Sequence, residues 1–247
     1  MCSHRLPVYL ATLQPIVTFF VPWQVCAFTT FLLVLILILE HYNFADTPGA
    51  NPFPFGSFGL HPILMVSAFG LCSPIAVVSY KTYEHFLGAS HGAVKALHAF
   101  LQSAALVLGG LGIASMYDTH SGARHFQTAH SWIGLAGFAI FAIQWFVGMV
   151  CFMAPCTPAK IRACLLVPHV MVGIAASLLT ILAVASGPLA LVWKPQNSTE
   201  FPNDPGFVSV GVWELANAAS LASAGLLLFL VLTMVEAQRI KMGSKKR

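Results

Sequence analysis

Charged residues are scarce in this sequence. Asp, Glu, Lys and Arg make up 8% of its 247 residues, while 57% are hydrophobic, and the mean hydropathy is +0.80. Soluble domains carry about 25% charged residues. So few charges cannot cover the surface of a water-soluble fold. The composition therefore excludes a soluble enzyme and predicts an integral membrane protein.

Other features are missing as well. The sequence has no C-x-x-C-H motif, so covalent attachment of a c-type haem is not expected. The six cysteines avoid the loops that the topology below assigns to the oxidising side of the membrane, so no disulfide framework is indicated. The pI is near 8.8, but the basic residues follow the membrane topology, and nucleic acid is not an expected partner.

Six apolar runs are each long enough for a membrane-spanning helix, which needs about 20 residues. They are Ile16–Leu39, His61–Tyr80, Val94–Met116, His130–Met153, Ile161–Ala185 and Val208–Val235. The first run is longer than the apolar region of a signal peptide, about 7–15 residues, and is interpreted as a retained helix. Because the connecting loops are short, we expect one all-α domain over residues 1–247, with a core at 61–185 and flanking helices at about 16–39 and 208–235.

The basic residues favour one orientation of these helices. If both termini are cytosolic, every Lys and Arg except Arg124 and Lys194 lies at or near a cytosolic end of a run. Such an asymmetry is what the positive-inside rule predicts. The sequon at Asn197 then falls on the non-cytosolic side, where a glycan is an open question.

Four histidines lie near the beginnings of four consecutive runs: His61, His98, His130 and His169. Consecutive helices alternate in direction, so His61 and His130 share the non-cytosolic leaflet, and His98 and His169 share the cytosolic one. The other six histidines fall in expected loops or tails: His4, His41, His85, His91, His120 and His125.

Two histidines at one depth on separate helices are typical of a bis-imidazole haem site in a helix bundle. The pattern therefore favours two non-covalent b haems, one for each pair. Three other interpretations stay open: packed, hydrogen-bonded histidines, a zinc site, and a proton or substrate pathway. Zinc is less favoured because the four histidines divide between two depths, with no Asp or Glu beside them inside the runs.

The sequences around these histidines resemble the cytochrome b561 family. The resemblance rests on HPILMVSAFG (61–70), KALHAFLQ (95–102), HSWIGLAGF (130–138), QWFVG (144–148) and RACLLVPHVMVG (162–173), in this order. It implies a six-helix protein whose central four-helix bundle holds two b haems and carries electrons from cytosolic ascorbate to an acceptor across the membrane. The ligand role then passes to His61, His98, His130 and His169.

Three basic residues are candidates for binding the anionic donor. Lys81 ends the second run, Lys95 lies three residues before His98, and Arg162 lies seven residues before His169. Cationic side chains at one haem edge would hold the ascorbate monoanion, and Arg can bind two oxygens at once. The resemblance implies the same role, but snorkelling side chains that enforce topology are the alternative.

On the non-cytosolic side the resemblance implies His120, in MYDTH (116–120), and Asn217 as substrate-binding residues. An exposed loop histidine and an interhelical amide are the alternatives. The chain departs from the family here, because Gln127 stands where a Tyr is common, three residues before the HSW motif. The acceptor, either monodehydroascorbate or a ferric chelate, is therefore left open.

The sequence thus predicts an ascorbate-dependent transmembrane oxidoreductase in a bilayer, of an endomembrane, vesicle or lysosome-like organelle or of the plasma membrane. A haem-free transporter or channel that uses its histidines is one alternative. A haem-binding structural or regulatory subunit without an ascorbate site is another. The oligomeric state, including a homodimer, is left open.

Overall fold

The computed structural model describes residues 21–43, 59–86, 88–119, 126, 128–154, 157–192 and 210–244. Within these ranges the regular structure is entirely helical. The helices are α2 (Val21–Asn43), α3 (Leu60–Met65), η2 (Val66–Cys72), α4 (Ser73–Phe86), α5 (His91–Thr119), α6 (Ala129–Gly148), η3 (Met149–Met153), α7 (Ala159–Val192) and α8 (Val210–Ser244).

Among the residues that the structure describes, six helical segments are long and apolar enough to cross a membrane. They are α2, the continuous segment α3–η2–α4, α5, α6 with η3, α7, and α8. The prediction of an all-α protein with six spans is confirmed, and the chain is a multi-pass membrane protein. Residues 16–20 of the first expected run lie outside the described residues.

Several helices extend beyond the apolar runs. Helix α2 reaches Asn43, α4 reaches Phe86 and α5 begins at His91. The placement of His41, His85 and His91 in loops was therefore wrong, because polar ends of these helices continue past the hydrophobic stretch that the sequence pattern detects. His4, His120 and His125 lie outside the described residues.

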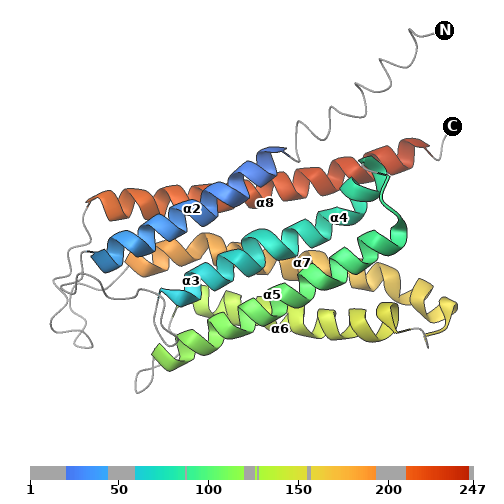
Figure 1. Ribbon diagram of the computed structural model, residues 1–247, viewed down its shortest axis with the longest axis horizontal. Helices are drawn as coiled ribbons and strands as arrows, with labels where there is room; N and C mark the ends of the chain where they lie inside the picture. The colour runs from blue at the N-terminus through green and yellow to red at the C-terminus, as the bar shows by residue number, and fades with distance from the viewer. Residues whose placement is uncertain are drawn as a thin grey trace, which may run out of the picture.

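The spans run back and forth in sequence order (Figure 1). The α3–η2–α4 segment, α5, α6 and α7 form the central group, while α2 and α8 lie side by side along one face. The connections α4–α5 and α6–α7 lie at the same end of the molecule, and α3 and α6 begin at the opposite end. Contacts are dense within the α4–α5 and α6–α7 pairs but sparse between α5 and α6.

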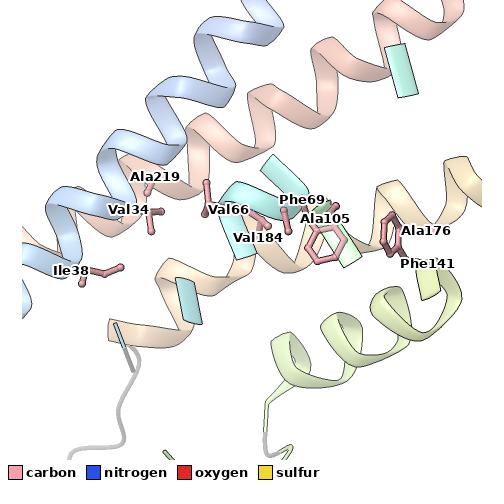
Figure 2. Packing of buried hydrophobic residues seen from close by; sticks show 10 residues of the cluster. Val34, Ile38, Val66, Phe69, Ala105, Phe141, Ala176, Val184 and Ala219 are labelled. Atoms are coloured by element: carbon pink, nitrogen blue, oxygen red, sulfur yellow. The ribbon is translucent and has the colours of Figure 1, made fainter. Parts of the chain in front are cut away.

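Small residues let the helices approach one another closely, as is common in membrane bundles. Ala68, Ala105, Ala176 and Ala219 are almost completely buried. With Phe69, Phe141 and aliphatic side chains they form one apolar cluster across α2, η2, α5, α6, α7 and α8 (Figure 2). Without a hydrophobic force between helices in lipid, this close packing is a main source of their association.

Several hydroxyl side chains inside the spans are satisfied locally. Thr30, Ser67, Ser103 and Ser177 each donate to the main-chain carbonyl four residues earlier, at 2.7–2.9 Å. A lipid interior supplies no water to hydroxyl groups, so bonding back to the same helix satisfies the donor at little cost.

Two spans contain a π segment, and α7 contains two prolines in its interior. The π segments η2 and η3 interrupt the second and fourth spans, and Pro168 and Pro188 lie inside α7. Proline removes an internal N–H donor and π segments shift the phase of the helix, which often occurs at functional sites. Pro168 directly precedes His169, and η3 directly follows Gly148, so both irregularities lie beside the residues described next.

Gly109 gives a test of this packing. A Cβ at Gly109 would lie 2.9 Å from ring carbons of both Phe138 and Phe69, whereas a Cβ at Gly110 would lie 3.8 Å from its nearest neighbour. We expect Gly109→Ala to lower the free energy of unfolding by about 1–3 kcal/mol through overpacking. Gly110→Ala is the matched control and should leave it unchanged or slightly raised. Equal unfolding midpoints of the two variants in mixed micelles would contradict the packing.

Candidate functional site

His61 on α3 and His130 on α6 face each other across the bundle. Their ring centroids are 6.2 Å apart and their planes are nearly perpendicular, at 86°. Both residues are only partly exposed. His130 lies in the first turn of α6, whose N-terminus is capped by Thr128, since its side chain accepts a hydrogen bond from the main-chain N–H of Ser131 at 3.2 Å. We call this part of the molecule the His61 end.

Three of the four imidazoles are oriented by main-chain carbonyls on a neighbouring helix. Nδ1 lies 2.9 Å from the carbonyl of Gly112 in His61, 2.8 Å from that of Ala76 in His98, and 3.0 Å from that of Ala183 in His130. Because a carbonyl can only accept, Nδ1 carries the proton in each case and Nε2 carries the lone pair. Such an outer contact fixes the tautomer of a metal-binding histidine.

His98 on α5 and His169 on α7 lie at the opposite end of the bundle, which we call the His98 end. Aromatic rings pack against both imidazoles: Tyr80 lies 5.3 Å from His98, and Phe152 lies 4.8 Å from His169, between ring centroids.

His169 is held by a side chain. The amide Nε2 of Gln144 on α6 lies 2.7 Å from Nδ1 of His169 and also contacts the main-chain carbonyl of His169. One helical turn further along α6, a Cβ built on Gly148 would lie 3.1 Å from Cε1 of His169. A side chain larger than hydrogen at residue 148 would therefore displace the ring.

These residues fit a metal held between two imidazoles. Two metal–nitrogen bonds of about 2 Å would place the ring centroids roughly 6 Å apart, and His61 and His130 have this separation. A Cβ at Gly187 would lie 3.3 Å from Cε1 of His130, so glycine leaves room for a ring at this end too. Among the residues that the structure describes, His, Cys, Asp and Glu form no group of three or more that suits a metal ion, which disfavours a tetrahedral zinc site.

Basic residues and aromatic rings gather at the His98 end. Lys95 lies one turn before His98 on α5, and Arg162 lies two turns before His169 on α7, so each shares a helix face with its histidine. Both side chains are half-buried. The backbone of Lys81 lies in α4 directly after Tyr80, while its side chain lies outside the described residues.

The structure says less about the two candidate substrate-binding residues of the non-cytosolic side, Asn217 and His120. Asn217 lies on α8 with an exposed side chain, and this helix packs on α2 and α7. His120 lies outside the described residues. Their substrate-binding roles stay predictions.

The structure adds residues to which the sequence pattern gave no role. Gln144 contacts His169, and the ring of His91, the first residue of α5, lies 5.7 Å from that of Tyr80. The QWFVG motif contains both Gln144 and Gly148 at a spacing of four residues, which places them on one helix face. That spacing was the available signal, but it does not say which neighbouring helix the face contacts.

The part of the chain that contains these four histidines matches a known protein family. Residues 60–194 match the family described as eukaryotic cytochrome b561. The matched range is more than half of the chain and contains all four histidines.

Individual relatives are similar over the same region. Ascorbate-specific transmembrane electron transporter 1 of Zea mays is 31% identical over 139 residues, which cover 56% of this chain and 56% of the relative. Transmembrane ascorbate ferrireductase 2 of Arabidopsis thaliana is 31% identical over 137 residues, 55% of this chain and 58% of the relative. Lysosomal membrane ascorbate-dependent ferrireductase CYB561A3 of Danio rerio is 28% identical over 181 residues, 71% of each chain. This chain spans less than two thirds of the length of the two plant relatives.

The imidazole geometry makes a prediction about tautomers. With Nδ1–H donating to a carbonyl, His61, His98 and His130 should be protonated at Nδ1 in the ligand-free chain. Nitrogen-15 NMR of the protein in bilayers distinguishes this tautomer from the one protonated at Nε2. A spectrum in which these three rings carry the proton at Nε2 would contradict the orientation of the rings.

Proposed function

The chain belongs to the eukaryotic cytochrome b561 family, and on this premise we propose that it carries electrons from cytosolic ascorbate across a membrane to an acceptor on the other side. The relatives' names support ascorbate as the electron donor, since they describe ascorbate-specific electron transport and ascorbate-dependent ferric reduction. The acceptor is a ferric chelate or monodehydroascorbate.

The observation that carries the proposal is the pair of imidazoles 6.2 Å apart, each tied at Nδ1 to a main-chain carbonyl. We assign His61 and His130 as the ligands of one b haem, and His98 and His169 as the ligands of the other. When bound, b haem supplies an iron that takes up and releases one electron at a time. The chain's own residues orient the ligand nitrogens and surround the groups with apolar side chains that exclude water.

We assign the His98 end to the cytosol. The basic residues support this orientation, because Lys95, Lys160 and Arg162 all lie at that end, as the positive-inside rule expects. The starts of α2 and α5 and the end of α8 also lie there (Figure 1). The name of the Danio rerio relative supports a lysosomal membrane as one location.

Ascorbate binds at the His98 end in this proposal. At neutral pH it is a monoanion, so Lys95 and Arg162 provide charge complementarity, and Lys81 adds a third basic position next to Tyr80. Arg162 donates to two ascorbate oxygens at once, which fixes the orientation of the donor as well as its charge. Because Tyr80 contacts the ring of His98, a donor held beside Lys81 lies close to the cytosolic ligand pair.

The acceptor binds at the His61 end. His120 and Asn217 are the proposed contacts, with His120 the stronger because imidazole binds iron as well as organic acids. The exposed side chain of Asn217 is open to a ligand on the surface of α8. An electron that moves outward carries charge across the membrane, so a potential difference changes the driving force by about 2.3 kcal/mol per 100 mV.

Substitution of the histidines in pairs tests the assignment. Replacing either His61 or His130 with Ala should remove the same one of two haems, and replacing either His98 or His169 should remove the other, because one remaining imidazole does not hold the group tightly. The measurement is haem per chain together with the reduced-minus-oxidised spectrum. Loss of different haems within one pair would overturn the pairing, and substrate flux without any reducible chromophore would favour a haem-free transporter.

Charge reversal tests the donor site. Lys95→Glu and Arg162→Glu should slow reduction by ascorbate at least tenfold, because they replace an attraction for the monoanion by repulsion at short range. Reduction by dithionite should be unchanged. Lys160→Glu is a matched control, since Lys160 is an exposed residue two positions before Arg162. Equal ascorbate rates in all three variants would favour a haem-binding subunit without an ascorbate site.

A further inference from the structure

Gln144 differs from the other groups that hold the imidazoles. His61, His98 and His130 are each held by a main-chain carbonyl, which no single substitution can remove. His169 is held by the side-chain amide of Gln144. Ser186 Oγ also lies 3.4 Å from Nδ1 of His130, but there it adds to a main-chain carbonyl at 3.0 Å. At His169 the group at Nδ1 is a side chain, which a substitution can replace.

The amide makes two contacts with one residue. It lies 2.7 Å from Nδ1 of His169 and also contacts the main-chain carbonyl of His169. A group that bridges the ring and the backbone of the same residue restricts the side-chain torsions between them. Gln144 is itself half-buried on α6, so this contact also ties α6 to α7.

His130, at the other end of the α6–α7 pair, is surrounded by a similar set of groups. There, α7 presents the Ala183 carbonyl to Nδ1 of His130, and Gly187, four residues later, to its Cε1. At the His98 end, α6 presents the Gln144 amide to Nδ1 of His169, and Gly148, four residues later, to its Cε1. A polar group and a glycine one turn apart thus support each ring, and the polar group is a side chain at His169.

The chemistry of a metal-bound imidazole fixes which amide atom is required. When Nε2 of a neutral histidine binds a metal, Nδ1 carries the proton and needs an acceptor. The oxygen and nitrogen of an amide exchange places by a 180° rotation. The exchange brings Oε1 within reach of Nδ1–H, so the amide accepts from the ring of a metal-bound His169 and gives up the contact of Nε2 with the His169 carbonyl.

We propose that Gln144 is the positioning residue for His169, and that its amide sets the electron affinity of the metal group that His169 holds. The inference rests on the proposed function, because it needs His169 to be a ligand. A stronger acceptor at Nδ1 makes the imidazole more basic and favours the oxidised metal, while removal of the acceptor does the reverse. The reduction potential of one haem then depends on residue 144 and that of the other does not.

Two substitutions with opposite chemistry test this. Gln144→Glu keeps the shape and places a carboxylate at Nδ1, and should shift the reduction potential of the His98/His169 haem in the negative direction. Gln144→Leu removes the acceptor and should shift it in the positive direction, with a loss of haem affinity at that position of roughly 10-fold to 100-fold. The His61/His130 haem is the internal control. Both potentials come from a spectroelectrochemical titration of the haem-loaded full chain, with the haems assigned by the paired histidine substitutions.

Gln102→Leu is the matched control. It removes the same amide from α5, one turn after His98, where Oε1 of Gln102 accepts no hydrogen bond from the described residues. We expect Gln102→Leu to leave the reduction potentials of both haems unchanged.

Each result of this experiment decides the matter. Shifts of opposite sign confined to one haem support the proposal. No shift, shifts of the same sign, or equal shifts in both haems would overturn it and leave Gln144 as a structural link between helices. If Gln144→Leu fails to fold, the sign of the shift in Gln144→Glu alone decides. An unaltered chain that binds no haem contradicts the proposed function itself, whereas two haems with potentials insensitive to residue 144 contradict only this inference.

Discussion

The need to satisfy an imidazole N–H inside a bilayer shapes the centre of this protein. A ring nitrogen facing hydrocarbon has no water to bond, so it must find its partner within the chain. His61, His98 and His130 find that partner in a carbonyl on a neighbouring helix. The same bond that satisfies Nδ1 leaves Nε2 with its lone pair, which is the form of the ring that the proposed ligand role needs.

The packing around the rings follows from this arrangement. A carbonyl on one helix reaches a ring on the next only if the two backbones lie close together, and small residues permit that approach. Gly148 and Gly187 lie against the Cε1 atoms of His169 and His130. The α4–α5 and α6–α7 pairs pack densely, as do α2 with α8 and α7 with α8, whereas α5 and α6 make few contacts. The sparse contact between α5 and α6 is compatible with the planar group that we propose lies between the helices.

Hydropathy and helix direction were sufficient to predict the six spans and the meeting of His61 with His130. Both predictions depend only on the length of the apolar runs and on the alternating direction of consecutive helices, which can be read from the sequence. The contact of Gln144 with His169 could not be predicted, because it depends on the rotation of α6 about its axis. The ends of α4 and α5 were missed because their polar residues, such as His85 and His91, remain helical after the apolar pattern stops.

The central claim is that paired histidines hold two haems through which the chain passes electrons across a membrane. Its most direct test uses the unaltered protein in proteoliposomes, with ascorbate enclosed and a ferric chelate or monodehydroascorbate outside. We predict two haems per chain, reduced by the enclosed ascorbate and reoxidised when the acceptor is added outside. Proteoliposomes that contain no haem, or whose haems do not respond to the enclosed ascorbate, would contradict the account.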